Sequence, residues 1–379
     1  MFTKNFRTKQ EQNYKSNPKG KDFIIGLDIG YSGTKVFYED GYFCFPSYAK
    51  KIEKGMINVP GEKDILYRDN ENGEEYMVGY IAQNMMDSND TNDTDGELYS
   101  RKRYGDKRFK ITANVAIALA TLNKKDSRKI VIQTGLPTSY VDGDTPAIKK
   151  AICKSSKFSL KVGGGKWIDF NFNIDPDDVY VMPQPAGTLY SSLITDDGSY
   201  VPDAKKILCS STLILDIGFG TFDFFGIKDR AIVCEESINE IGMRAVLNRT
   251  SKKILKNFNE DIRVAALQKN LETGVVNCIN EDDMTAEEQP LEPILKEASR
   301  EIMLDAMERV KSVTNTFRGY QYVIVSGGTG EAWFEDIKKW LSNMNTLTVN
   351  PSNKNDGLPF IYSNARGYYL YRYTLNKQQ

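Results

Sequence analysis

The chain has 379 residues, and its 50 basic and 51 acidic side chains leave a formal net charge of −1. Apolar residues make up 40% of it, which excludes a disordered chain, and the charge balance excludes a strongly basic nucleic-acid-binding protein. The sequence contains no histidine, which excludes Ser-His-Asp and Cys-His catalysis and every His-ligated metal. Any enzyme chemistry must therefore use carboxylates, amides, hydroxyls, lysine or a metal ion that arrives with the substrate.

The cysteines and the N-terminus indicate a protein of the reducing cytoplasm. The five cysteines are odd in number and none are spaced as CxxC, so buried thiols are expected rather than disulfides or a zinc site. No apolar run approaches the roughly 18 residues that cross a membrane. Residues 1–21 are basic and polar, and we expect them to form a disordered tail.

Strand-like and helix-like segments alternate along the chain, which predicts an α/β protein. We expect a small inserted subdomain over residues 46–108, with a flexible acidic loop over residues 87–97. The other expected elements, in chain order, are strand 22–29, buried helix 109–122, strand 129–134, hairpin 158–162 with 167–174, strand 179–182, a helix ending at 193, a strand from 213, helices 239–257, 261–271 and 291–317, strand 322–325 and a helix from 331.

An internal repeat is the strongest signal. Residues 27–30 and residues 215–218 both read LDIG within an apolar strand, and about half the chain separates them. Each copy continues with Gly and Ser or Thr, and then with an aromatic-rich strand. Such turns expose backbone N–H groups that bind phosphate, and an Asp at the strand end can hold hydrated Mg²⁺. A third glycine turn follows at residues 326–330. The repeat predicts two duplicated domains that grip a polyphosphate from opposite sides.

With these motifs the chain resembles the superfamily of actin, sugar kinases and heat-shock chaperone ATPases. Residues 28–35 (DIGYSGTK) are similar to its first phosphate loop, residues 215–223 to its second, and residues 323–330 to its nucleotide-binding loop. The MPQPAG and NARGYY segments resemble most closely the plasmid-segregating bacterial actins of the ParM type. The resemblance implies duplicated actin-like, ribonuclease H-like domains that face each other across a nucleotide cleft.

The resemblance also implies roles for individual residues. Asp28 and Asp216 would hold Mg²⁺ through water, and Gln184 and Asp216 would be the catalytic residues, with Gln184 orienting the attacking water. Phe219 departs from the family, where Gly or Asp is usual, so its side chain must point away from the phosphate or displace the loop. The nucleotide would be bound by Gly30, Ser32, Gly33, Thr34, Lys35, Gly218, Gly220, Thr221, Gly242, Gly327, Gly328 and Thr329.

Two other segments invite a functional interpretation. The three glycines before Lys166 lack the spacing of a phosphate loop and predict a hairpin turn. The basic run over residues 101–110 is expected to be a solvated loop or a subunit contact rather than a nucleic-acid site.

The expected domains are domain I over residues 22–210, domain II over residues 211–362 with a helical subdomain at about 239–318, and a C-terminal helix over residues 363–379 that returns to domain I. The expected function is a filament-forming nucleoside triphosphatase that hydrolyses ATP or GTP with Mg²⁺ in the cytoplasm and drives plasmid DNA segregation. Its partners would be further copies of itself and a centromere-binding adaptor of the ParR type, with DNA bound only indirectly and no membrane. The alternatives are a metabolite kinase of the same superfamily and a cell-shape actin.

Overall fold

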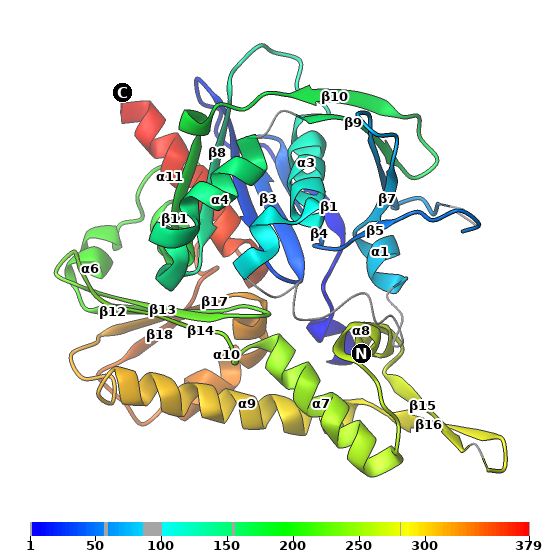
Figure 1. The fold of residues 1–379 in the computed structure, drawn as a ribbon. Coiled ribbons are helices and arrows are strands. Elements are labelled where there is room, and N and C mark those ends of the chain that lie inside the picture. The colour runs from blue at the N-terminus through cyan, green and yellow to red at the C-terminus, as the bar shows by residue number, and fades with distance from the viewer. Residues whose placement is uncertain (1, 57–59, 86–100, 154–155, 281, 379) are drawn as a thin grey trace. The chain divides into compact units, whose positions relative to one another are not determined.

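The computed structural model describes residues 2–56, 60–85, 101–153, 156–280 and 282–378 (Figure 1). The expected acidic loop at residues 87–97 lies outside these residues. The chain divides into two compact units. In the described residues, unit I comprises the chain between Thr8 and Lys205 and the segment 352–378, and unit II comprises the chain between Lys206 and Pro351 and the N-terminal segment that ends at Arg7.

Unit I is built on a six-stranded sheet. Its order is β1-β4-β3-β2-β8-β11, in which β2, β8 and β11 are parallel and the other neighbours antiparallel. The buried apolar runs of the central strands explain why both faces of the sheet are covered. The strands are β1 (Glu11–Tyr14), β2 (Phe23–Ile29), β3 (Gly33–Tyr38), β4 (Gly41–Pro46), β8 (Ile130–Leu136) and β11 (Val179–Pro183).

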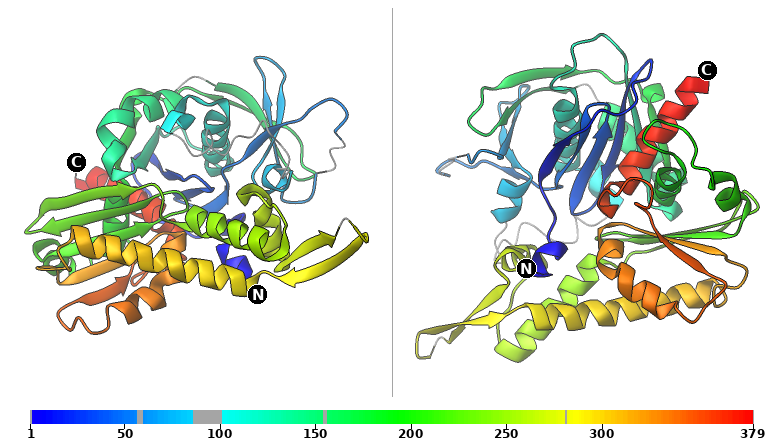
Figure 2. Two further views of the ribbon diagram at one scale, coloured as in Figure 1. Left: turned by 60° about the horizontal axis from the view of Figure 1, so that its bottom comes forward. Right: turned by 180° about the vertical axis from the view of Figure 1, so that it is seen from behind.

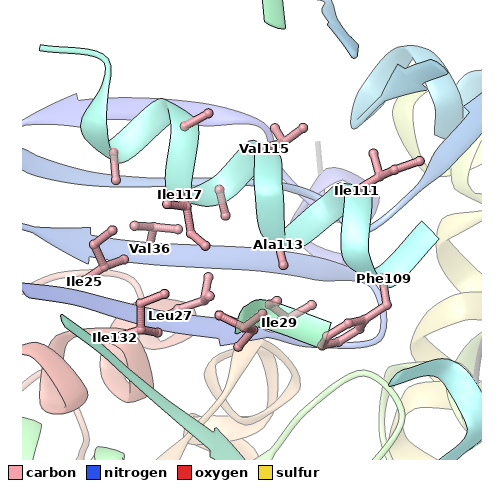
Figure 3. Close-up of a cluster of buried hydrophobic side chains, with 14 of the residues drawn as sticks. Ile25, Leu27, Ile29, Val36, Phe109, Ile111, Ala113, Val115, Ile117 and Ile132 are labelled. Carbon is pink, nitrogen blue, oxygen red and sulfur yellow. The ribbon is translucent and has the colours of Figure 1, made fainter. Parts of the chain in front are cut away.

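Two helices approach this sheet from opposite faces. Ile25 and Leu27 on β2 belong to one buried cluster with the apolar residues of α3 (Lys107–Thr121), and Figure 3 shows this packing. Gly26 points to the other face because side chains alternate along a strand. There a Cβ on Gly26 would lie 2.1 Å from the carbonyl oxygen of Ala365 in α11 (Ser363–Gln378). The glycine therefore permits α11 to lie directly on β2.

The small subdomain of unit I is a separate five-stranded sheet in the order β10-β9-β6-β7-β5. The expected hairpin, β9 (Ser156–Val162) with β10 (Ile168–Phe172), forms and pairs with the inserted strands. The subdomain therefore draws residues from beyond the expected boundary at 108. Its remaining elements are β5 (Ala49–Lys51), β6 (Ile65–Asp69), β7 (Glu75–Val78) and α1 (Tyr80–Asn84).

The other helical elements of unit I connect its strands. They include α5, which starts at Gln184, the residue expected to orient the attacking water. They also include η2, which lies in the basic run at residues 101–110. That run is therefore ordered as a turn and the start of α3, not as a solvated loop. The elements are η2 (Arg101–Gly105), η3 (Thr138–Tyr140), α4 (Val141–Cys153), η4 (Pro176–Asp178), α5 (Gln184–Leu193) and η5 (Phe360–Tyr362).

Unit II repeats the sheet of unit I. Its order, β14-β13-β12-β17-β18, corresponds to β4-β3-β2-β8-β11, with the same antiparallel and parallel neighbours. The duplication expected from the sequence is thus present in the topology. The strands are β12 (Thr212–Ile217), β13 (Phe222–Lys228), β14 (Ala231–Ile238), β17 (Tyr322–Ser326) and β18 (Thr348–Pro351).

The helices of unit II form where helical periodicity predicts them, and Figure 2 shows α7 and α9 from two further sides. The region between α8 and α9 also holds a hairpin, β15 (Val275–Asn280) with β16 (Thr285–Pro290), which the expected helical subdomain did not include. Unit II ends at Pro351, earlier than the expected residue 362. The helices are α7 (Met243–Phe258), α8 (Val264–Thr273), α9 (Glu292–Val313) and α10 (Gly328–Trp340), and α6 (Ala204–Cys209) precedes the sheet.

The N-terminal segment differs from the expected disordered tail. Residues Phe2–Phe6 form η1, in which Phe6 is buried within unit II, and Lys4 and Arg7 both pair with Glu272 of α8. Beyond Arg7 the chain enters unit I, where β1 extends the sheet by pairing with β4. Apolar burial and backbone pairing thus order a segment whose composition is polar. None of the described helices has the length and apolar character needed to span a membrane.

Candidate functional site

The first glycine turn of the repeat joins β2 to β3 in unit I. The backbone N–H of Gly30 donates to the carbonyl oxygen of Gly33 at 3.0 Å and closes the turn. A Cβ on Gly30 would lie 2.8 Å from Nζ of Lys35 and 2.9 Å from the carbonyl oxygen of Gly33, so the turn requires glycine there. The backbone of the turn is therefore compact and not covered by a side chain at Gly30.

Three expected site residues meet at the end of β2. Asp28 is only 4% exposed, and its two carboxylate oxygens have different partners. Nζ of Lys35 lies 3.2 Å from Oδ2, and Nε2 of Gln184 donates to Oδ1 at 3.3 Å. Since β2 and β3 are antiparallel with Asp28 opposite Lys35, the pairing register sets the ion pair. Gln184 reaches the same carboxylate from the first residue of α5.

Ser47, which follows β4, bonds to two residues of this turn. Thr34 is buried, and its Oγ1 lies 2.9 Å from Oγ of Ser47. The backbone N–H of Ser47 in turn donates to the carbonyl oxygen of Ser32 at 3.0 Å. Ser47 thus supports two of the expected residues, although sequence reasoning did not select it. Its only sequence signal is its position after the apolar strand at residues 41–46.

The second turn, between β12 and β13 in unit II, has the same closure. The N–H of Gly218 donates to the carbonyl oxygen of Thr221 at 2.9 Å, which repeats the spacing of the Gly30–Gly33 bond. Gly220 lies within this turn. The turn closes normally with Phe219 in it, so the bulky residue does not displace the loop. The carbonyl oxygen of Phe219 is fixed by the N–H of Arg244 at 2.8 Å.

Two further segments hold the second turn in place. Thr329, at the start of α10, donates from Oγ1 to the carbonyl oxygen of Gly218 at 2.7 Å. Gly242 precedes α7 with φ +140°, and a Cβ there would lie 2.7 Å from the same oxygen. Gly327 precedes α10 with φ +81°, and a Cβ there would lie 2.3 Å from the carbonyl oxygen of Ile217. Both glycines therefore permit helix N-termini to approach the turn closely.

Asp216 lies beside these elements at the end of β12. It is buried, and its Oδ1 would be 2.8 Å from a Cβ on Gly327. The structure thus gathers the expected residues of each unit around its own turn. Unit I holds Asp28, Gly30, Ser32, Gly33, Thr34, Lys35 and Gln184, and unit II holds Asp216, Gly218, Gly220, Thr221, Gly242, Gly327, Gly328 and Thr329.

The donor chemistry of the two turns fits a magnesium ion. Asp28 and Asp216 each place a carboxylate at the end of a buried strand, and carboxylate oxygen is a preferred ligand of Mg²⁺. Within the described ranges no three His, Cys, Asp or Glu side chains are grouped to hold a metal. Single carboxylates suit an ion that keeps several waters and takes other ligands from a phosphate.

The cysteines do not contribute to the site. All five are free thiols; Cys44 is buried, whereas the other four are half-buried rather than buried as expected. Burial raises the pKa of the Cys44 thiol to about 11. A thiol with such a pKa is a poor nucleophile at neutral pH.

Comparison with known proteins identifies the fold. Residues 26–187 match the family model described as Actin like proteins N terminal domain. The structure is similar to a non-polymerisable quadruple mutant of pCBH ParM, with a TM-score of 0.70, 18% identity, and coverage of 94% of this chain and 100% of that one. It is equally similar, with a TM-score of 0.70 and 19% identity, to ParM in a 15-stranded filament from Clostridium botulinum, over 94% of this chain and 99% of that one.

A third similar structure is Ta0583, an archaeal actin homologue in complex with ADP, with a TM-score of 0.58 and 19% identity over 91% of this chain and 97% of that one. No curated protein sequence matches the chain. The chain has the actin fold, with an actin-like N-terminal domain over residues 26–187. This fold confirms the architecture that the motifs predict.

Proposed function

We propose that this protein is an actin-like nucleoside triphosphatase that binds ATP or GTP with Mg²⁺ and polymerises into filaments. The observation that carries the proposal is the duplication of one arrangement: a buried strand with Asp as its second-to-last residue, followed by a glycine turn closed by the same backbone hydrogen bond. The ADP complex of the archaeal actin homologue supports nucleotide binding by the fold.

Each turn supplies what a phosphate group needs. Glycine-rich turns leave backbone N–H groups accessible, and Lys35 adds a positive charge at the first turn. At the second turn, Thr221, Gly327 and Thr329 surround the strand end, and the start of α10 adds the positive end of a helix dipole. The two turns would serve the phosphates of one nucleotide, with Gly242 and Gly328 beside them.

Hydrolysis requires positioning and charge neutralisation rather than a covalent intermediate. A magnesium ion, held through water by Asp28 and Asp216, would neutralise the phosphate charge. Gln184 donates its amide hydrogen to Asp28, which fixes the side chain and leaves Oε1 to accept a hydrogen bond from the attacking water. No step needs histidine, which agrees with the composition.

Phosphate release tests the enzymatic part of the proposal. The wild-type protein should hydrolyse ATP or GTP in the presence of Mg²⁺, and Asp28→Asn and Asp216→Asn should each reduce turnover by about 10²-fold or more. Asp203→Asn, which removes an exposed carboxylate of unit I, is the matched control and should leave turnover unchanged. Wild-type turnover in both site variants would refute the assignment of the two carboxylates.

The proposed cellular role is plasmid segregation by filaments. A head-to-tail contact between copies does not close on itself and generates an open filament, and the ParM structure from Clostridium botulinum is a filament. A net charge of −1 disfavours direct binding to DNA, so an adaptor of the ParR type would join the filament to the plasmid. Purified protein should not shift plasmid DNA at physiological salt; sequence-specific binding by this chain alone would refute the adaptor.

A further inference from the structure

Arg103 is a buried cation directly behind the first glycine turn. It belongs to η2, within the basic run whose function the sequence left open, and is only 8% exposed. Its Nη2 donates to the carbonyl oxygen of Ile29, the last residue of β2, at 2.9 Å. Its guanidinium lies 4.1 Å from the ring centroid of Tyr31. The side chain therefore contacts the residues on both sides of Gly30.

The contact with Ile29 bears on the geometry of the turn. The carbonyl group of Ile29 and the N–H of Gly30 belong to one planar peptide unit, so fixing the first orients the second. The N–H of Gly30 is the donor that closes the turn onto Gly33. Arg103 thus fixes the peptide plane on which the turn depends. The planar guanidinium can make this bond and stack on Tyr31 together, which an ammonium group cannot do.

Among the residues that the structure describes, no protein carboxylate balances the charge of Arg103. In the described part of the chain no Asp or Glu forms an ion pair with it, and its buried Nε has no hydrogen-bond partner. The neighbouring Arg108 differs, because it pairs with Asp106 at 2.7 Å. A buried cation without a counter-ion is unfavourable until an anion approaches. Its position behind Gly30 and Tyr31 makes a phosphate at the turn the natural source of that anion.

A small cavity adjoins this arrangement. It has a volume of about 30 Å³ and is lined by Gly30, Ser47, Arg103, Asp106 and Thr112, among other residues. This volume admits a water molecule rather than a phosphate group. The cavity therefore has no room for a phosphate group in direct contact with Arg103.

We propose that Arg103 is a positioning residue for phosphate binding at the first turn, which it orients through the Ile29–Gly30 peptide and to which it adds positive potential. The inference rests on the proposed nucleotide binding. Arg103 should strengthen binding of the triphosphate but not of the nucleoside, because only the triphosphate carries the negative charge that Arg103 attracts. The basic run at residues 101–110 thereby gains a function in the protein's own site.

The test measures dissociation constants for MgATP or MgGTP, whichever the wild type binds, and for the corresponding nucleoside. Arg103→Gln should weaken binding of the triphosphate roughly tenfold or more, the magnitude expected for a lost charge-assisted interaction. It should weaken binding of the nucleoside far less. Arg103→Lys keeps the charge but not the stacking geometry and should recover part of the affinity. Lys102→Gln, which removes an exposed charge from the adjacent position, should bind as the wild type does.

The outcomes separate the two proposals. If the wild type binds no nucleotide, the proposed function fails. If the wild type binds but Arg103→Gln retains its affinity, or loses triphosphate and nucleoside affinity equally, the role of Arg103 is wrong. Thermal unfolding of each variant shows whether it is folded. If Arg103→Gln does not fold, the test uses Arg103→Lys and its ratio of triphosphate affinity to nucleoside affinity. A ratio below that of the wild type supports the role of Arg103, and an unchanged ratio refutes it.

Discussion

Replacing Gly327 by alanine tests the packing of the second turn. Gly327 has φ +81° and ψ 159°, a region almost exclusive to glycine, which costs another residue about 1–3 kcal/mol. Its new Cβ would also lie 2.3 Å from the carbonyl oxygen of Ile217 and 2.8 Å from Oδ1 of Asp216, so backbone must move. Overpacking of this kind costs about 1–3 kcal/mol. The two effects together should lower the free energy of unfolding of unit II by about 2–6 kcal/mol.

Gly319→Ala provides the matched control. Gly319 lies in the same unit with φ +82°, but nothing lies within 4 Å of a Cβ there, so only the conformational cost remains. Urea unfolding can be followed by tryptophan fluorescence in a Trp167→Phe background, because the other two tryptophans, Trp333 and Trp340, both lie on α10. Gly327→Ala should unfold at lower urea than Gly319→Ala and should bind Mg-nucleotide more weakly. Equal stability of the two variants would refute the close approach of Gly327 to the turn.

Four further predictions follow from the described contacts. Gln184→Ala should retain nucleotide binding but lose about 10²-fold in turnover; unchanged turnover in a phosphate-release assay would exclude its role with the attacking water. Chelation of Mg²⁺ by EDTA should abolish turnover and excess Mg²⁺ should restore it, whereas activity that persists in EDTA contradicts the metal assignment. Gly367→Ala places a Cβ 1.8 Å from the carbonyl oxygen of Gly187 and should lower the melting temperature of unit I, unlike Gly164→Ala, whose Cβ meets nothing within 4 Å. Because burial raises the pKa of Cys44 to about 11, iodoacetamide at pH 8 should spare Cys44 in the native protein and modify it in urea; rapid native modification would contradict its burial.

The sequence predicts the sheets and turns well where the signal is local. Residues 27–30 and 215–218 carry an apolar strand, a terminal Asp and a glycine in four consecutive positions, so strand, turn and carboxylate are all visible at once. The long helix α9 is equally clear, because its apolar residues repeat at helical spacing over six turns of chain. The repeat also reveals the duplicated topology, since both copies must build the same hairpin.

Other elements depend on partners far away in the sequence. Strand β1 is polar and alternates between half-buried and exposed residues, so its order comes from backbone pairing with β4 rather than from apolar residues. Strand β16 is almost wholly exposed and has no apolar alternation to indicate a strand. The burial of Arg103 likewise cannot be predicted from the basic run around it, because it depends on the contacts of η2 with Ile29 and Tyr31. Local composition cannot predict these contacts.

Sedimentation of the wild-type protein at tens of micromolar, with and without Mg-nucleotide, tests the central claim most directly. Added MgATP or MgGTP should transfer the protein from the supernatant to the pellet until the nucleotide is exhausted. In a separate sample, a non-hydrolysable analogue should keep the protein in the pellet for longer. Asp216→Asn, measured beside it, should remain in the supernatant under the same conditions. A wild-type protein that stays in the supernatant with either nucleotide would contradict the account of this chain as a nucleotide-dependent filament protein.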